Sequence, residues 1–236
     1  MQPKYKRILL KLSGEALAAD KSQGILHNEF LDRVVSVIGR LAREGVEVGI
    51  IVGAGNIWRG RQGGVSDRTR GDYMGMLATA INAMALGDAC IRAGLDARVL
   101  SALSMPEIGE YYTRDAAVRH LEAGRVVIFA CGLGRPYFST DTAGALRAAE
   151  IGADVILMAK NIDGVYTADP RVDATAVKLS AITYGELLDR GLKVVDLTSA
   201  VLCMENSIPT LVFGLEDPEN IYRAAMGESL GTLITV

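Results

Sequence analysis

The chain of 236 residues is half hydrophobic and carries 28 acidic against 25 basic side chains, a net charge of −3. This length suits one large domain or two small ones, and the mild negative charge argues against a nucleic-acid surface. Glycine is over-represented: its 26 residues are about 11% of the chain, against an average of about 7%. The positions of the glycines are therefore the first question.

Several protein classes are excluded by what the sequence lacks. No uninterrupted apolar run approaches the roughly 18–20 residues of a membrane span, and Lys11 breaks the apolar stretch near the start, unlike in a signal peptide. Cys90, Cys131 and Cys203 lie far apart, so neither a disulfide framework nor a zinc ribbon is expected. We expect a cytoplasmic protein that binds neither membranes nor nucleic acid.

Apolar runs of strand length alternate with segments of helical periodicity. Strands are expected at residues 7–12, 46–52, 97–100, 126–131, 155–159 and 210–213. Helices are expected at 30–41, 73–93, 113–123, 142–151 and 198–206, four of them ending near Gly45, Gly94, Gly124 and Gly152. Continuous apolarity is typical of strands buried on both faces of a parallel sheet. The order predicts an α/β fold, a three-layer α/β/α sandwich around a mainly parallel sheet, as one domain with surface loops at 59–71 and 161–175.

Glycine-containing turns follow four of the predicted strands. They hold Gly14, Gly53 with Gly55, Gly132 with Gly134, and Gly164. In a parallel sheet these turns share the carboxyl edge, where ligands of open α/β sheets bind, and glycine lets backbone N–H groups approach phosphate oxygens. A glycine that merely ends a strand is the alternative at any one turn. Neither a P-loop nor a Rossmann fingerprint is present, since Trp58 stands where the latter needs its third glycine.

Two charged residues stand near these turns. Lys11 interrupts a strand whose interior is expected to be buried, where an unpaired lysine is rare. Either it reaches water at an edge, or its ammonium group neutralises a transferring phosphoryl group. Asp141 lies in GRPYFSTDTAG, between a strand and a helix. One alternative is that Thr140 or Asp141 caps that helix. The other is that Asp141 supplies a carboxylate beside Lys11. A third polar cluster, by itself a plausible surface turn, comprises Asp163, Tyr166 and Asp169.

Six segments, taken in this order, carry a family resemblance: YKRILLKLSGEAL, GAGNIWRG, GDYMGMLATAINAMAL, GRPYFSTDTAGALRAAEIGAD, DGVYTADP and GTLITV. On them the chain resembles the amino-acid kinase family over essentially its whole length, and GDYMGMLAT and PYFSTD resemble its bacterial-type uridylate kinases. The resemblance implies transfer of the γ-phosphoryl group of ATP to UMP, with Mg²⁺, giving ADP and UDP. The N-terminal part would mainly bind UMP and the C-terminal part ATP. A homohexamer, activation by GTP and inhibition by UTP are also implied, and the apolar helix expected at 73–93 is either core or interface.

The resemblance also implies roles for individual residues. Lys11, Asp141 and Arg59 would be catalytic: Lys11 stabilises the transferring charge, Asp141 orients Lys11 and helps organise Mg²⁺, and Arg59 holds phosphates. The residues implied to bind ATP are Lys11, Leu12, Ser13, Gly14, Gly55, Arg59, Lys160, Tyr166 and Asp169. Those implied to bind UMP are Ala54, Asp72, Leu133, Gly134, Arg135, Pro136, Tyr137, Phe138, Ser139 and Thr140. The chain departs from the family at Ala54, usually glycine, and at Lys160-Asn161, often a threonine–lysine pair.

Two other hypotheses compete with a UMP kinase. A relative of the same family would phosphorylate a small carboxylate such as glutamate, acetylglutamate or carbamate. A non-catalytic protein on the same fold would only bind or store nucleotides. The GDYMGM and PYFSTD segments favour a nucleotide acceptor, and Lys11 together with Asp141 favours catalysis. A UMP phosphate is already largely ionised near neutral pH, so the reaction requires no general base.

Overall fold

The computed structural model describes residues 2–18, 24–58 and 66–236. Its elements in chain order are β1 (Arg7–Leu12), the 3₁₀ helix η1 (Gly14–Ala18), α1 (Asn28–Arg43), β2 (Glu47–Val52), α2 (Arg68–Arg92), β3 (Ala97–Ser101), β4 (Glu110–Tyr111), α3 (Arg114–Glu122), β5 (Val126–Ala130), α4 (Thr140–Ile151), β6 (Val155–Lys160), β7 (Val165–Tyr166), β8 (Lys178–Leu179), β9 (Ala181–Thr183), α5 (Tyr184–Asp189), α6 (Leu197–Glu205), β10 (Thr210–Gly214), α7 (Glu219–Ala225) and β11 (Thr232–Thr235).

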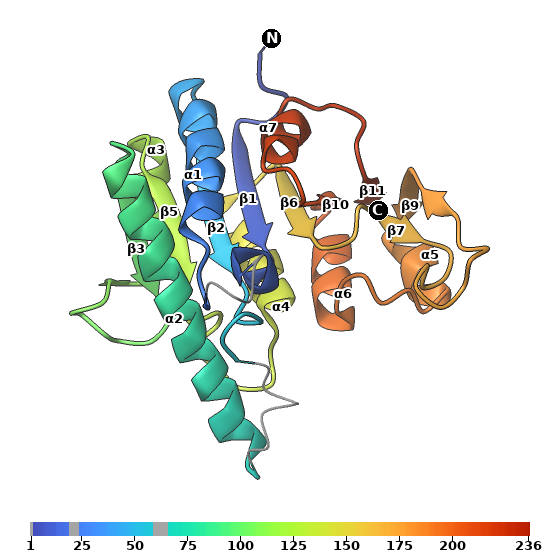
Figure 1. The fold of residues 1–236 in the computed structure, drawn as a ribbon, viewed down its shortest axis with the longest axis horizontal. Helices are drawn as coiled ribbons and strands as arrows, with labels where there is room; N and C mark the ends of the chain where they lie inside the picture. Colours follow the sequence, from blue (N-terminus) through green and yellow to red (C-terminus); the bar gives the residue numbers. More distant parts are fainter. Residues whose placement is uncertain (1, 19–23, 59–65) are drawn as a thin grey trace.

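A nine-stranded sheet of order β4-β3-β5-β2-β1-β6-β10-β11-β9 runs through the molecule (Figure 1). Its described strand pairs are parallel except β10 with β11, which is antiparallel. The central strand β1 lies between β2 and β6, so that Lys11 is opposite Ile51 and Met158. The mainly parallel α/β sheet predicted from the continuously apolar runs is confirmed.

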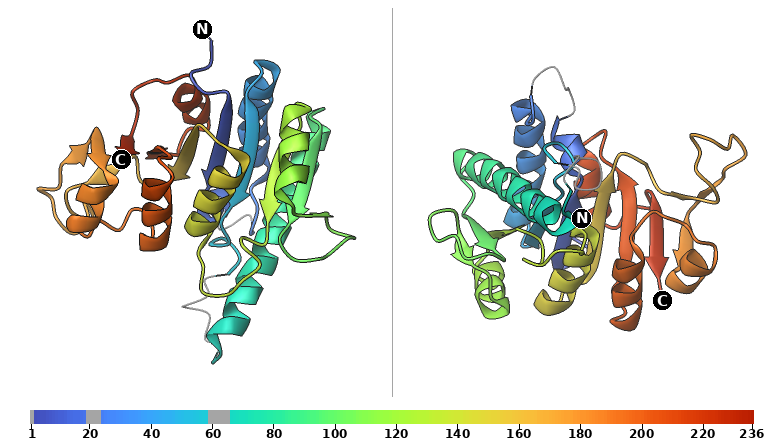
Figure 2. Two further views of the ribbon diagram at one scale, coloured as in Figure 1. Left: turned by 180° about the vertical axis from the view of Figure 1, so that it is seen from behind. Right: turned by 90° about the horizontal axis from the view of Figure 1, so that it is seen from below.

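Helices cover both faces of this sheet (Figures 1 and 2). One hydrophobic cluster joins the sheet to α1, α2 and α7, and a second joins it to α3, α4, α5 and α6. Along β1, Leu10 and Leu12 belong to the first cluster and Leu9 to the second. Since side chains alternate along a strand, Lys11 is directed to the same face as Leu9, the face that α4 covers.

Helix α2 is the longest helix described, and its N-terminal part extends past the carboxyl ends of β1 and β2 (Figure 1). Its length and an 18-residue window of mean hydropathy 1.4 would suffice for a membrane span by those two criteria alone. It is the apolar helix expected at 73–93, and its apolar residues do not form one uninterrupted run because Asn82, Gly87 and Asp88 interrupt them. In the folded chain 56% of that window is buried, as in the core helix of a soluble protein.

The observed boundaries differ from the predicted ones in several places. Residues 68–71 of the predicted loop 59–71 belong to α2, whose N-cap is Asp67, and residues 59–65 lie outside the described part. The predicted loop 161–175 contains β7, which pairs with β8. The sequence showed no period for β4, β9, β11, α5 and α7, because elements of two to seven residues are too short to display one.

Candidate functional site

Three charged side chains meet at the carboxyl ends of β1 and β6. Lys11 Nζ lies 2.8 Å from Asp141 Oδ1, and Lys160 Nζ lies 3.3 Å from Asp141 Oδ2. Lys160 also donates a hydrogen bond to the carbonyl of Val194. The three side chains are only 10%, 15% and 19% exposed, in the order Lys11, Asp141, Lys160. One carboxylate therefore holds two ammonium groups at the edge of the sheet.

The local charges determine how this cluster titrates. Burial alone would raise the pKa of Asp141, but the charges of Lys11 and Lys160 outweigh it and hold the pKa at about 2. Burial lowers the pKa of Lys160, an effect that Asp141 opposes. Asp141 is thus a carboxylate throughout the neutral range.

The first turn of α4 explains why Asp141 is available to the lysines. The prediction that Thr140 or Asp141 caps this helix is wrong. The cap is Ser139, whose Oγ accepts hydrogen bonds from the backbone N–H groups of Asp141 and Thr142 at 3.0 and 3.1 Å. Because Ser139 satisfies these donors, the Asp141 carboxylate is left to Lys11 and Lys160.

The glycine turns after β1 and β2 are in direct contact beside this cluster. A Cβ atom on Gly14 would lie 2.2 Å from the carbonyl oxygen of Gly53, so only glycine permits this approach. The N–H groups of Ala54 and Gly55 donate to no acceptor in the described part of the chain. They are the kind of free backbone donors that bind phosphate oxygens.

The loop between β5 and α4 contacts α2 across the same edge. Asp72 Oδ2 accepts a hydrogen bond of 2.7 Å from the N–H of Tyr137. Tyr137 and Cys131 have left-handed backbones, with φ of 73° and 63°, an unusual conformation for residues other than glycine. The rings of Tyr137 and Phe138 are 64% and 50% exposed. Exposed aromatic rings beside a carboxylate suit the binding of a nucleobase and its sugar.

Some predicted site residues lie apart from this arrangement. The hydroxyl of Tyr166 donates to Asp163, and Asp169 pairs with Arg171. Tyr166 and Asp169, two of the residues implied to bind ATP, thus bond locally around β7 and β8. No described contact joins them to Lys11 or Asp141. Arg59 lies outside the described residues.

Asp196 is a site residue that the sequence analysis missed. It caps α6, accepting from the N–H of Ser199 at 2.9 Å, and it also accepts from the hydroxyls of Ser139 and Thr142. Asp196 therefore ties the N-termini of α4 and α6 together beside the Lys11–Asp141–Lys160 cluster. The available signal was an aspartate three residues before a serine at the start of an apolar helical run.

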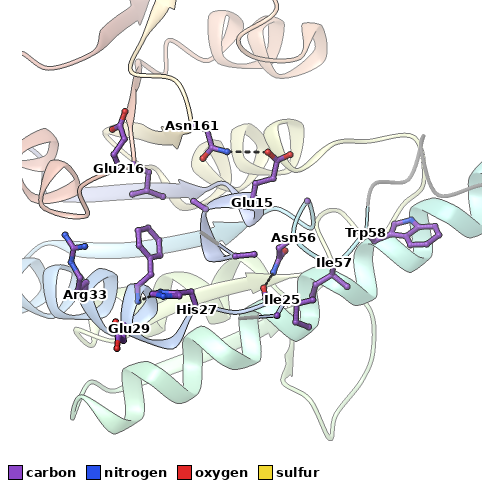
Figure 3. Close-up of a pocket in the computed structure, with 16 residues that line it drawn as sticks. Glu15, Ile25, His27, Glu29, Arg33, Asn56, Ile57, Trp58, Asn161 and Glu216 are labelled. Atoms are coloured by element: carbon purple, nitrogen blue, oxygen red, sulfur yellow. Dashed lines mark hydrogen bonds between the residues drawn. The ribbon is translucent and has the colours of Figure 1, made fainter. Parts of the chain in front are cut away.

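A cavity of about 1300 Å³ borders the turn after β2 from the side of α1 (Figure 3). Glu15, His27, Asn56 and Trp58 are among its lining residues, whereas Lys11 and Asp141 are not. It is therefore adjacent to the charged cluster and separate from it. Among the described residues no group of three His, Cys, Asp or Glu side chains is placed to hold a metal ion.

Comparison with known proteins agrees with this geometry. The model of the amino acid kinase family matches residues 6–214. The solved structure of UMP kinase from Bacillus anthracis is 35% identical, with a TM-score of 0.93 over 98% of this chain and 96% of that one. UMP kinase from Ureaplasma parvum is 34% identical, with a TM-score of 0.91 over 99% of this chain and 100% of that one. Uridylate kinase from Archaeoglobus fulgidus is 31% identical, with a TM-score of 0.75 over 97% of this chain and 99% of that one. The chain belongs to the amino acid kinase family.

Proposed function

We propose that this protein is a UMP kinase, which transfers the γ-phosphoryl group of ATP to UMP and releases ADP and UDP. The observation that carries the proposal is the buried Lys11–Asp141 pair beside two glycine turns at the carboxyl edge of the sheet. Similarity to two UMP kinases at 34–35% identity over nearly the full length supports it.

Charge neutralisation and alignment supply the chemistry. A phosphate oxygen of UMP attacks the γ-phosphorus of ATP, the bond to the β,γ-bridging oxygen breaks, and ADP departs. UMP has a second phosphate pKa of about 6, so the nucleophile is ionised at neutral pH and no base is required. Lys11 faces the charge that develops on the transferring group, while Asp141 fixes the direction of its ammonium group. Arg59 is the further cation that the family resemblance implies here.

UMP occupies the N-terminal half of the edge in this proposal. Asp72 Oδ1 has no partner among the described residues, so it is available to accept a hydrogen bond from a ribose hydroxyl, while Oδ2 holds the N–H of Tyr137. Residues 133–140 surround the base, the N–H of Ala54 binds the UMP phosphate, and the N–H of Gly55 binds phosphate between donor and acceptor. The methyl group of Ala54 leaves its backbone donor intact.

ATP is bound mainly by the C-terminal part of the chain, by the segment after β6, together with residues 11–14 at the end of β1. Tyr166 and Asp169 follow that segment, and the family resemblance implies that they contact the base and ribose of ATP. Lys160, also implied to bind ATP, contacts Asp141 and the Val194 carbonyl. We therefore assign it to the charged cluster.

Mg²⁺ enters the site with ATP in this proposal, bound mainly by the phosphates. Both carboxylate oxygens of Asp141 are engaged by lysines, and no other described carboxylate lies in the cluster to complete a protein-built metal site. The metal would neutralise phosphate charge, and the protein's own contribution is the positioning of Lys11 and of the backbone donors.

A homohexamer in the cytoplasm, activated by GTP and inhibited by UTP, completes the proposal on the strength of the family resemblance. One structural feature supports self-association. The exposed face of α2 carries a row of large apolar side chains, Tyr73, Met74, Leu77, Ile81, Met84 and Ile91, each 38% to 65% exposed. A row of this kind on a monomer is typical of a surface that a partner covers.

A coupled assay of ADP release tests the function. Purified protein is given ATP and Mg²⁺ with UMP, CMP, glutamate or acetylglutamate in separate reactions. UMP is expected to be the preferred acceptor. ADP formed with glutamate or acetylglutamate but not with UMP would identify a carboxylate kinase, and nucleotide binding without ADP release would identify a non-catalytic protein.

A further inference from the structure

We infer that Asn82, a buried side chain of α2, is a positioning residue that fixes the turn at residues 53–56 in its phosphate-binding form. The inference rests on the proposed function, and it concerns a residue that touches neither substrate.

Asn82 is an amide inside an otherwise apolar helix. It has no exposed surface, and a buried amide is costly unless it is hydrogen-bonded. Its Nδ2 donates to the carbonyl of Gly53 at 2.8 Å and to Asn56 Oδ1 at 2.8 Å, and its Oδ1 accepts from Asn56 Nδ2 at 2.9 Å. Both hydrogens and the oxygen of Asn82 are used, and every bond goes to the turn after β2.

Asn56 completes the connection. Its Nδ2 also donates to the carbonyl of Ile25 at 2.7 Å, and Figure 3 shows the two residues approaching from separate segments. The reciprocal amide pair of Asn56 and Asn82 thus joins α2, the turn and the chain leading into α1. The orientation of the pair is fixed because the second N–H of each amide donates to a backbone carbonyl, Gly53 for Asn82 and Ile25 for Asn56.

The turn requires this support because of its glycines. The N–H of Gly53 donates to the carbonyl of Leu12 at 3.1 Å, so β1 fixes one side of the residue. Glycine rotates freely about its other backbone bond, and among the described residues only Asn82 donates to the Gly53 carbonyl. In a trans peptide the C=O of one residue and the N–H of the next point in opposite directions. Anchoring the Gly53 carbonyl on α2 therefore directs the Ala54 N–H away from α2, and leaves it free for phosphate.

The same helix holds the second nucleotide loop. The hydroxyl of Thr79, three residues before Asn82 and on the same face, accepts from the N–H of Cys131 at 3.0 Å. Asp72 of α2 accepts from Tyr137 farther along that loop. A single rigid element thus positions both loops, and Asn82 is its contact with the phosphate turn.

The test compares ligands with and without a phosphate, on purified full-length protein by calorimetry. For Asn82→Ala we expect UMP affinity to fall at least about tenfold while uridine affinity changes less than about twofold, because only phosphate binding uses the turn.

Asn56→Ala, a milder change at a half-buried residue, should weaken UMP binding about threefold. Combined with Asn82→Ala it should add little, since both act through one pair. Asn206→Ala is the matched control: this asparagine donates to the Leu202 carbonyl on α6, and its loss should leave both affinities unchanged.

Equal weakening of UMP and uridine by Asn82→Ala, or no weakening of UMP, would overturn the inference. If Asn82→Ala fails to fold, the ratio of the two affinities in Asn56→Ala decides in the same way. Failure of the proposed function has a different signature, namely wild-type protein that binds UMP but forms no UDP with ATP. Wild-type protein that does not bind UMP would overturn both.

Discussion

Lys11 and Asp141 lie 2.8 Å apart where the central strand ends and α4 begins, and both are nearly buried. An unpaired ammonium group at this depth would be strongly disfavoured, so the Asp141 carboxylate compensates the buried charge and holds Lys11 in place. Lys160 contacts the second oxygen of the same carboxylate. The lysine charge is therefore fixed in position before any nucleotide arrives, which is the condition under which a charge contributes most to phosphoryl transfer.

Replacement of this lysine should abolish most of the activity without unfolding the protein. For Lys11→Met, which keeps the aliphatic stem, we expect kcat to fall by about 10²-fold or more, because one preorganised charge is lost from the transition state. The measurement is coupled ADP release at saturating UMP and ATP. Lys6→Met is the matched control, since Lys6 pairs with Glu47 at 3.8 Å before the start of the same strand. Turnover near the wild-type value in Lys11→Met would contradict the role of Lys11.

Asp141 should make stability depend on pH in the acid range only. Its pKa is about 2 in the folded protein against an ordinary value of 3.8, so the stabilisation is complete above about pH 4 and is lost as the pH falls through about 2. Urea unfolding of the wild type and Asp141→Asn should differ by a constant amount, on the order of 2–4 kcal/mol, between pH 5 and 8. The difference should shrink below pH 4. A difference that stays constant down to pH 2.5 would contradict the low pKa.

Lys160→Met distinguishes a lysine that orients Asp141 from one that binds the nucleotide. In the first case kcat should fall about tenfold while KM for ATP changes less than about twofold, and Lys160→Arg should restore part of the loss, because arginine still pairs with the carboxylate. Steady-state kinetics with varied ATP provide the measurement. A raised KM for ATP at unchanged kcat would return Lys160 to the nucleotide site implied by the family resemblance.

The sequence predicted the fold better than it predicted the contacts within the candidate site. Continuously apolar runs and helix-ending glycines identified the parallel sheet, since both patterns follow from burial and backbone freedom. That Asp141 supplies a carboxylate beside Lys11 was one of two alternatives from the residues alone, and only the family resemblance favoured it over capping. The roles of Asn82 and Asp196 were not foreseen, because each depends on which loop a helix packs against. For Asn82 the visible signal was a polar amide within the apolar segment LATAINAMAL.

Asp72 should control UMP binding selectively. Asp72→Asn keeps an oxygen for the N–H of Tyr137 but removes the charge that a ribose hydroxyl would meet, so KM for UMP should rise about tenfold at unchanged KM for ATP. Kinetics with each substrate varied in turn measure this. Asp88→Asn, which removes an exposed carboxylate paired with Arg92 on the same helix, should change neither constant. Parallel rises in both KM values for Asp72→Asn would indicate a general loss of structure.

The apolar face of α2 predicts that a single charge there dissociates the oligomer. Ile81 is 45% exposed and Leu77, one turn earlier, is 49% exposed, so Ile81→Glu would place a carboxylate within the apolar row. Burying that charge in an interface costs several kcal/mol, enough to convert a stable assembly into smaller species at micromolar concentration.

Light scattering after size exclusion should show a hexamer for the wild type and a lower mass for Ile81→Glu. Val172→Glu introduces the same charge at a residue that is 84% exposed outside α2, and its mass should equal that of the wild type. A wild-type monomer, or an unchanged mass for Ile81→Glu, would exclude this face of α2 as the interface.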